Sequence, residues 1–123
     1  MRLLLLGADF NDRQAIGSLL PPDSWKIICH SSVKELQGVA STCGVIDVIV
    51  MNLESPVERS FDLIPLVKET CPKVEVILIS RLAEEELWIE SIQRGAYDLL
   101  SKPLEKSEFL RVIRNAVEKH SSP

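Results

Sequence analysis

The chain has 123 residues, 46% of them hydrophobic, with a formal net charge of −4 and a pI near 5.2. A chain of this size and apolar content can bury one core without disulfides or metals, which predicts a single domain. The acidic balance argues against nucleic-acid binding by this segment, because neutralising a phosphate backbone requires a concentrated basic face.

The amino-terminal leucine run, residues 3–6, is much shorter than the roughly 7 to 15 apolar residues of a signal-peptide core or the ~20 of a membrane span. The three cysteines, Cys29, Cys43 and Cys71, are widely spaced in apolar surroundings. Their odd number and spacing favour buried free thiols in a reducing compartment over a disulfide framework or a zinc site. We therefore expect a cytoplasmic domain.

The first half of the chain alternates short apolar runs, which predict buried strands, with segments of helical periodicity. Asn11 or Asp12 can cap a first helix that Pro21 ends, and Ser31 or Ser32 can cap a second. The expected elements are, in order, a strand at 3–6, a helix at 11–20, a strand at 25–29, a helix at 31–44 and a strand at 45–51.

The second half continues the alternation. Pro65 is tolerable only in the first turn or two of a helix, and Gly95 can supply the left-handed end of another. The expected elements are, in order, a loop at 53–60, a helix through about residue 70, a strand at 74–79, a helix at 83–94, a strand at 98–101 and a helix at 106–119.

Five strands that alternate with helices through short connections imply parallel pairing with right-handed crossovers. We expect an α/β fold with a doubly wound, five-stranded parallel sheet in the order 2-1-3-4-5, helices on both faces, flavodoxin-like. The carboxyl ends of parallel strands lie at one edge of the sheet, where ligands and chemistry gather. The groups expected to converge there are Gly7–Asp9, Asn52, Ser80 and Lys102–Pro103.

Three stretches of the sequence are distinctive motifs: residues 46–56, residues 76–80 and above all residues 95–103, GAYDLLSKP. Because of these motifs the chain resembles, over essentially its whole length, the receiver domains of two-component response regulators, most closely those fused to sigma-54-dependent activators. The resemblance implies a receiver-like domain at residues 1–119 and a tail or the start of a linker at residues 120–123.

In that family, two adjacent acidic residues after the first strand and an aspartate ending the third hold magnesium, and that aspartate accepts a phosphoryl group from a histidine kinase. A hydroxyl and a lysine after the fourth and fifth strands bind the phosphoryl oxygens. The resemblance places the hydroxyl on Ser80 and the lysine on Lys102, followed by the customary Pro103. It places the acidic pair on Gly7 and Ala8, and the acceptor on Asn52.

These departures have chemical consequences. An amide nitrogen is not a carboxylate nucleophile, and magnesium prefers hard oxygen ligands, commonly carboxylates. Asp9 and Glu54 are close to the pocket in sequence, but neither replaces the lost geometry, and the family's aromatic switch position holds Leu99. We expect a pseudo-receiver with no enzyme activity, cofactor or metal, which acts through protein contacts and controls transcription through a fused output domain.

Two alternatives remain open. The domain could accept a phosphoryl group on another residue, such as Asp9, or its altered pocket could bind a small ligand or an anion. Lys102 is expected to hydrogen-bond the oxygen of Asn52, to pair with Asp9 or Glu54, or to bind an anion, because a partly buried ammonium without a partner is unfavourable. A flavodoxin-type enzyme is not favoured, because no glycine-rich phosphate loop follows the first strand.

The expected partners are other protein domains, either an output domain or a regulatory protein, and neither nucleic acid nor a membrane. The last two helices and the fifth strand are a candidate homodimer surface. There, the basic residues Lys106, Arg111 and Arg114 could meet Glu90 and Asp98 of a second copy.

Overall fold

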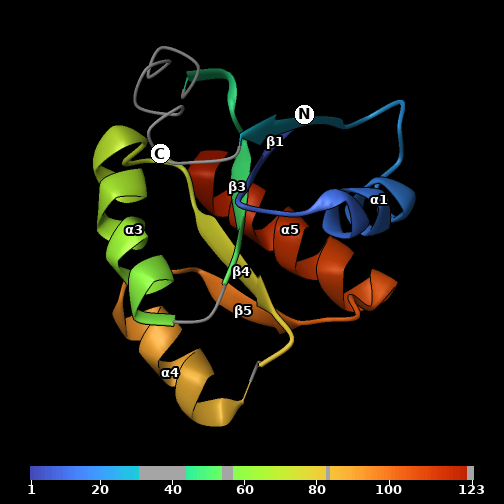
Figure 1. The fold of residues 1–123 in the computed structure, drawn as a ribbon. Coiled ribbons are helices and arrows are strands. Elements are labelled where there is room, and N and C mark those ends of the chain that lie inside the picture. Colours follow the sequence, from blue (N-terminus) through green and yellow to red (C-terminus); the bar gives the residue numbers. More distant parts are fainter. Residues whose placement is uncertain (31–43, 54–56, 83, 122–123) are drawn as a thin grey trace.

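The structure is a computed structural model that describes residues 1–30, 44–53, 57–82 and 84–121. Within these ranges, five strands form one parallel sheet in the order β2-β1-β3-β4-β5 (Figure 1). The strands are β1 (Arg2–Leu6), β2 (Lys26–His30), β3 (Val48–Asn52), β4 (Val76–Ser80) and β5 (Asp98–Ser101). The predicted doubly wound, flavodoxin-like fold is confirmed.

Helices cover both faces of this sheet (Figure 1). Helices α1 (Phe10–Leu19) and α5 (Lys106–Ser121) pack on one face, and α3 (Val57–Thr70) and α4 (Glu85–Gln93) pack on the other. The helix that the sequence predicts at residues 31–44 falls, apart from Gly44, outside the described residues.

Alternating side chains of the central strands supply two separate apolar clusters. Leu3 and Leu5 of β1 pack in the cluster under α1 and α5, whereas Leu4 and Leu6 pack in the cluster under α3. All four side chains are buried. Burial on both faces explains why β1, β3 and β4 are continuous apolar runs, and it holds the strand ends on a close-packed platform.

Strand β4 begins at Val76, two residues later than the sequence predicts, because the backbone groups of Val74 form hydrogen bonds outside the sheet. The ammonium of Lys68 donates to the Val74 carbonyl at 3.0 Å, and the Val74 N–H donates to the Cys71 carbonyl at 3.2 Å. These two bonds make a turn after α3, so pairing in the sheet starts only beyond it.

Helix α3 begins at Val57, earlier than expected, which places Pro65 inside the helix. The expectation that Pro65 lies within the first two turns is therefore wrong. Proline cannot donate to the carbonyl of Phe61, four residues back. Pro65 lies on the exposed side of α3, where solvent can reach the helix backbone.

The described cysteines differ from the expected buried free thiols. Cys71 is buried but disulfide-bonded, and Cys29 is a free thiol but exposed. The expectation is therefore wrong for both, and Cys43 lies outside the described residues. No helix in the described ranges is long and apolar enough to cross a membrane.

The connection from β5 to α5 is fixed by Glu105, the residue before the helix. Its carboxylate accepts hydrogen bonds from the backbone N–H groups of Glu108 at 2.7 Å and Ser107 at 3.0 Å, which are free donors at a helix start. These bonds favour the charged form and hold the pKa of Glu105 below its ordinary value. The cap thereby sets where α5 begins, shortly after Lys102 and Pro103.

Candidate functional site

The carboxyl edge of the sheet brings together the chain segments that the sequence predicts. Gly7 follows β1, Asn52 ends β3, Ser80 ends β4, and Lys102 follows β5. Gly7 has a φ of +63°, a left-handed conformation that suits glycine. Parallel register places these strand ends side by side, so the predicted convergence is present in the fold.

Asn52 lies at the end of β3, where it pairs in register with Ile79 of β4. Its side-chain oxygen Oδ1 is buried. The next residue, Leu53, donates its N–H to the Ile79 carbonyl at 2.8 Å, so the backbone on both sides of the Asn52 side chain is held by the sheet. Glu54, the pocket-adjacent acid of the sequence prediction, lies outside the described residues.

Ser80 is buried at the end of β4. Its hydroxyl oxygen accepts a hydrogen bond from the Leu82 N–H at 2.9 Å, and its carbonyl accepts one from the Lys102 N–H, also at 2.9 Å. Ser80 therefore shapes the turn after β4 and links the end of β4 to the start of the β5–α5 connection.

Asp9 and Asp12 form a reciprocal cap at the start of α1. Asp9 is the N-cap residue, and its Oδ1 accepts a hydrogen bond from the Asp12 N–H at 2.8 Å. The Asp12 carboxylate in turn accepts a long bond of 3.4 Å from the Asp9 N–H. The sequence prediction of Asn11 or Asp12 as the capping residue is therefore wrong, and Asp9 has a structural role.

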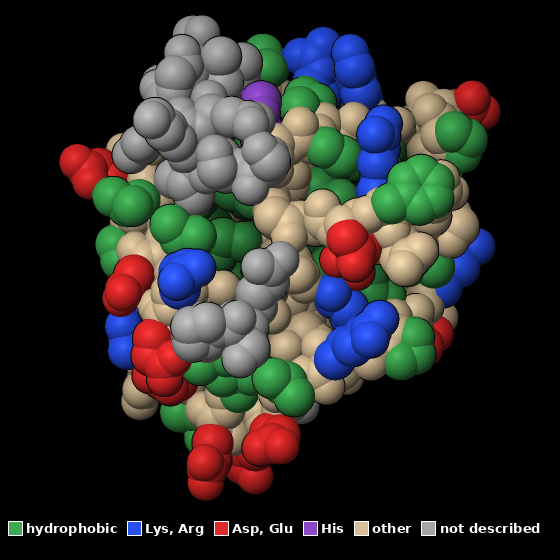
Figure 2. All heavy atoms as spheres, in the orientation of Figure 1, with side chains coloured by type: hydrophobic (Ala, Val, Ile, Leu, Met, Phe, Trp, Pro, Cys, Tyr) green, Lys and Arg blue, Asp and Glu red, His purple; other side chains and the backbone are tan. Residues whose placement is uncertain are grey.

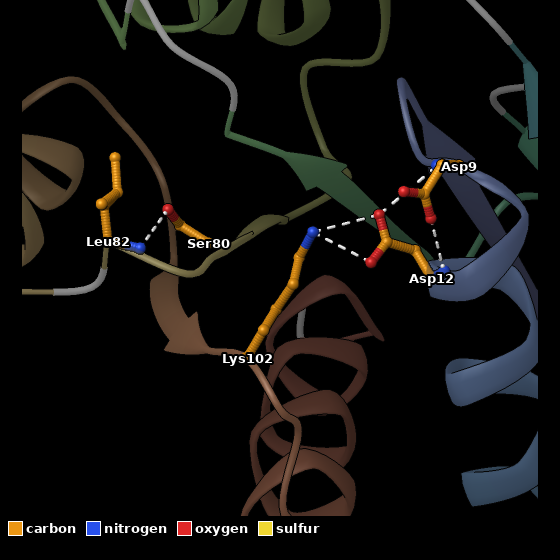
Figure 3. A network of polar contacts seen from close by, with 5 residues as sticks. All are labelled: Asp9, Asp12, Ser80, Leu82 and Lys102. Carbon is orange, nitrogen blue, oxygen red and sulfur yellow. Dashed lines mark hydrogen bonds and ion pairs between the residues drawn. The ribbon is translucent and has the colours of Figure 1, made fainter.

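The Lys102 ammonium lies on the Asp12 carboxylate (Figure 3). Its nitrogen Nζ is 2.9 Å from Oδ1 and 3.1 Å from Oδ2 of Asp12, so both carboxylate oxygens face the cation. Within the described residues, these are the contacts that the ammonium makes. The expectation that an acidic residue partners Lys102 holds, but the acid is Asp12 rather than Asp9, and no hydrogen bond joins Lys102 to Asn52.

This ion pair is largely removed from solvent. The side chains of Lys102 and Asp12 are 16% and 9% exposed. Their attraction is screened less there than at a surface, but both groups also lose hydration. The pair therefore fixes α1 against the end of β5, and either charge left without the other would be strongly unfavourable.

The side-chain oxygens of the described residues at this edge do not form a carboxylate site for a magnesium ion. Gly7 and Ala8 bring no side-chain oxygen, and Asn52 brings a neutral amide. The carboxylates of Asp9 and Asp12 are engaged in the helix cap and the ion pair. Among the residues described, no group of three or more His, Cys, Asp or Glu side chains lies close enough to hold a metal.

Leu99, the residue that the sequence prediction assigns to the switch position, is 5% exposed and packs in the core. Beside it, Asp98 accepts two hydrogen bonds on Oδ1, from the Leu99 N–H at 2.8 Å and from the Trp88 indole N–H at 2.7 Å. Trp88 comes from α4 and is 45% exposed. This contact ties α4 to β5 through side chains that the sequence prediction treated separately.

Asp12 is the site residue that the sequence reasoning did not assign. A usable signal was present, since an acid three residues after Asp9 fits the spacing of a capping box. That spacing predicts Asp9 as the N-cap of α1 and places Asp12 in its first turn, near the sheet edge. The partnership with Lys102 spans 90 positions and carries no local signal.

Comparison with known proteins decides the family. The model of the response regulator receiver domain matches residues 12–114. This chain belongs to the response regulator receiver family. The receiver match includes β2 to β5, α3, α4 and the Asp12–Lys102 pair. It leaves out β1, the first two residues of α1 and the last seven of α5.

The curated relatives include two-component response regulator-like proteins and DNA-binding transcriptional regulators. It is 31% identical to the two-component response regulator-like protein APRR9 of Arabidopsis thaliana over 111 residues, 88% of this chain and 24% of that protein. It is 32% identical to the DNA-binding transcriptional regulator NtrC of Rhizobium meliloti over 71 residues, 58% of this chain and 15% of that protein. The chain thus spans a quarter or less of these relatives.

Solved structures agree on the receiver fold. A receiver domain protein from Clostridium thermocellum has a TM-score of 0.79 at 24% identity, covering 96% of this chain and 94% of that one. The beryllofluoride-activated NtrC4 receiver domain dimer has a TM-score of 0.81 at 23% identity and covers 98% of each chain. At this identity the likeness establishes the fold.

Proposed function

We propose that this receiver domain is a pseudo-receiver in a cytoplasmic transcription regulator: it signals through protein contacts and does not form an acyl phosphate. One observation carries the proposal. The ammonium of Lys102, the residue that would bind a phosphoryl oxygen, lies 2.9 Å from the carboxylate of Asp12. The lysine is therefore neutralised from within the fold, while Gly7, Ala8 and Asn52 occupy the positions of the family's three acids.

The chemistry of these residues supports the same proposal. The Asn52 amide is a poor nucleophile toward phosphorus, and the Lys102 ammonium, which would stabilise a dianionic phosphoryl donor, is paired with the Asp12 carboxylate. Asp9 is disfavoured as a substitute acceptor, because one of its oxygens holds the N–H of Asp12 and its position is set by the helix cap.

The test is phosphorylation of the unmodified chain. After incubation with acetyl phosphate and magnesium, we expect intact-protein mass spectrometry to show no phosphoryl adduct. Beryllofluoride with magnesium should leave the amide resonances of Asn52, Ser80 and Leu99 in place. A receiver that has all three acids, treated in parallel, controls for the reagents. A magnesium-dependent adduct that disappears in Asp9→Ala would instead establish the alternative acceptor.

The expected contact surface is formed by α4, β5 and α5. It has a groove of about 310 Å³ between the helices, and the groove lining includes Trp88 from α4 and Arg111 from α5. The lining carries acidic side chains from both helices, Glu85 of α4 and Glu108 of α5, beside one basic side chain, Arg111 of α5. Two copies related by a two-fold axis can each place Arg111 against acids of the other, which favours a second copy as the partner. The NtrC4 relative, named as a receiver domain dimer, supports this choice of partner.

Reversing the charge of Arg111 is expected to weaken self-association. In Arg111→Glu, the acidic groups of a second copy would face a like charge, and we expect the dimer dissociation constant to rise by roughly tenfold. Sedimentation velocity over a concentration series measures it. Arg59→Glu, an equal change on the far helix α3, is the control. Equal dimerisation of both variants would contradict this surface.

A further inference from the structure

We infer that a small organic carboxylate with a short apolar chain binds in a cavity beside the Lys102–Asp12 pair, between α1 and the β5–α5 connection. This site shares Lys102 with the sheet edge around Asn52, but its other lining residues come from α1, the turn after β4 and the β5–α5 connection, and its test does not use phosphorylation. Four features carry the inference: the volume of the cavity, its charge balance, a basic side chain with spare donors, and an apolar wall.

The cavity holds about 480 Å³, within the usual size of a small-molecule site. Residues from three separate parts of the chain line it: α1, the turn after β4, and the start of the β5–α5 connection. Because the helix cap at Asp9 and the Lys102–Asp12 pair hold these parts together, the cavity is formed by the fold before any ligand enters.

The charge balance of the lining favours one negative charge. Asp12 and Lys102 neutralise each other, which leaves the guanidinium of Arg81 as the excess. Arg81 makes no ion pair or hydrogen bond with the described part of the chain. Figure 2 shows basic side chains next to acidic ones near the centre of this face. In a chain whose net charge is −4, a local excess of positive charge selects a monoanion over a cation.

Two side chains have N–H donors available for that anion. An ammonium carries three donors, and Lys102 directs its contacts at the two oxygens of Asp12, so one N–H remains. The planar guanidinium of Arg81 can grip a carboxylate with two parallel hydrogen bonds. A carboxylate lying between Arg81 and Lys102 would therefore be bound by charge-assisted hydrogen bonds.

Most of the remaining wall of the cavity is apolar, and Asn11 and Ser18 of α1 are its uncharged polar members. Ala15 and Leu19 contribute the apolar part from α1, and Pro103 and Leu104 contribute it from the β5–α5 connection. A fully hydrated inorganic anion would leave this wall in contact with water. An alkyl chain attached to the carboxylate would instead bury it, at a gain of affinity for each methylene. The lining thus selects an organic acid over phosphate.

Calorimetric titration of the chain with sodium hexanoate tests the site. We expect saturable binding with a dissociation constant on the order of 1 mM, and acetate should bind more weakly by roughly fourfold for each methylene lost. Hexanol has the alkyl chain but no charge, and inorganic phosphate has the charge but no alkyl chain. Each should therefore bind at least about tenfold more weakly than hexanoate.

Two variants locate the site. Arg81→Gln removes the excess charge and should weaken hexanoate by about tenfold or more, because a charge-assisted hydrogen bond is lost. Ala15→Leu fills the cavity from an exposed helical position that accepts leucine, and it should abolish binding while circular dichroism stays unchanged. Arg59→Gln, which loses the same charge on α3, should bind as the original chain does.

The inference fails if hexanoate does not saturate, or if Arg81→Gln and Arg59→Gln bind it equally. It also fails if phosphate or hexanol binds as tightly as hexanoate, since the site would then recognise charge or apolar surface alone. Both results are independent of the phosphorylation test, because neither variant changes Asn52, Ser80 or the helix cap.

Discussion

Lys102→Met is expected to lower the free energy of unfolding by about 2 to 4 kcal/mol, because it leaves the Asp12 carboxylate largely buried without its counter-ion. Methionine keeps most of the apolar stem of lysine, so the variant removes the charge while most of the packing is retained. The Asp12 side chain is only 9% exposed, which limits how far water can replace the ammonium. Urea denaturation followed by circular dichroism measures the change.

A double-mutant cycle separates the pair from its surroundings. Asp12→Asn keeps an oxygen that can accept the Asp9 N–H, so the helix cap survives while the charge is removed. The double variant Asp12→Asn with Lys102→Met leaves no buried charge unpaired. We therefore expect its loss of unfolding free energy to be about 2 kcal/mol smaller than the sum of the losses in the two single variants. Additive losses would show that the two side chains are not coupled.

The matched control for this cycle is Glu90→Gln. Glu90 pairs with Arg94 at 3.1 Å, and the side chains of Arg94 and Glu90 are 42% and 45% exposed, so loss of this charge should change the free energy of unfolding by less than about 1 kcal/mol. If Lys102→Met is no more destabilising than Glu90→Gln, the Asp12 pair contributes no more than a surface contact and does not lock α1 to the sheet.

The fold could be predicted from the sequence because its signals are local and redundant. The runs that became β1, β3 and β4 are apolar without interruption, since their side chains enter two clusters on opposite faces of the sheet. Strands of this kind must lie inside a parallel sheet with helices on both sides. Each predicted strand ends within one residue of the end of the observed strand, which was enough to place Asn52 and Ser80 at the carboxyl edge.

Element boundaries failed where a backbone group found a partner outside its own element. Val74 looks like the first residue of a strand, but its carbonyl is taken by Lys68 of α3. The start of α1 was missed for a related reason, since three neighbouring polar residues can all cap a helix and only the reciprocal bonds between Asp9 and Asp12 distinguish them.

The partner of Lys102 could not be predicted, because it depends on how α1 lies against β5. Sequence spacing ranks Asp9 nearer to the lost acidic pair than Asp12. In the fold, Asp9 is held at the helix cap, and one turn of α1 brings the Asp12 carboxylate to the ammonium. A contact of this kind is set by helix packing, to which residues far along the chain contribute.

Restoring the acceptor alone is expected to leave the domain unphosphorylated: Asn52→Asp should show no more phosphoryl adduct with acetyl phosphate and magnesium than the original chain. The new carboxylate would be a competent nucleophile, but magnesium would still lack the two acidic ligands that Gly7 and Ala8 replace. Lys102 would also remain on Asp12, 2.9 Å away. Intact-protein mass spectrometry over a time course measures the adduct.

Adduct should form only when Asn52→Asp is combined with Gly7→Asp and Ala8→Asp, and faster still when Asp12→Asn releases Lys102. Gly7 has a φ of +63°, so aspartate there carries a strain of about 1 kcal/mol or more, and the combined variants need a folding check by circular dichroism. The acids at positions 7 and 8 would supply magnesium ligands, whereas Asp12→Asn would free the Lys102 ammonium. Comparing the adduct yield after each change therefore separates the effect of the missing ligands from the effect of the Lys102–Asp12 pair. Robust magnesium-dependent labelling of Asn52→Asp by itself would contradict the proposal, since one substitution would then separate this domain from an ordinary phosphoacceptor.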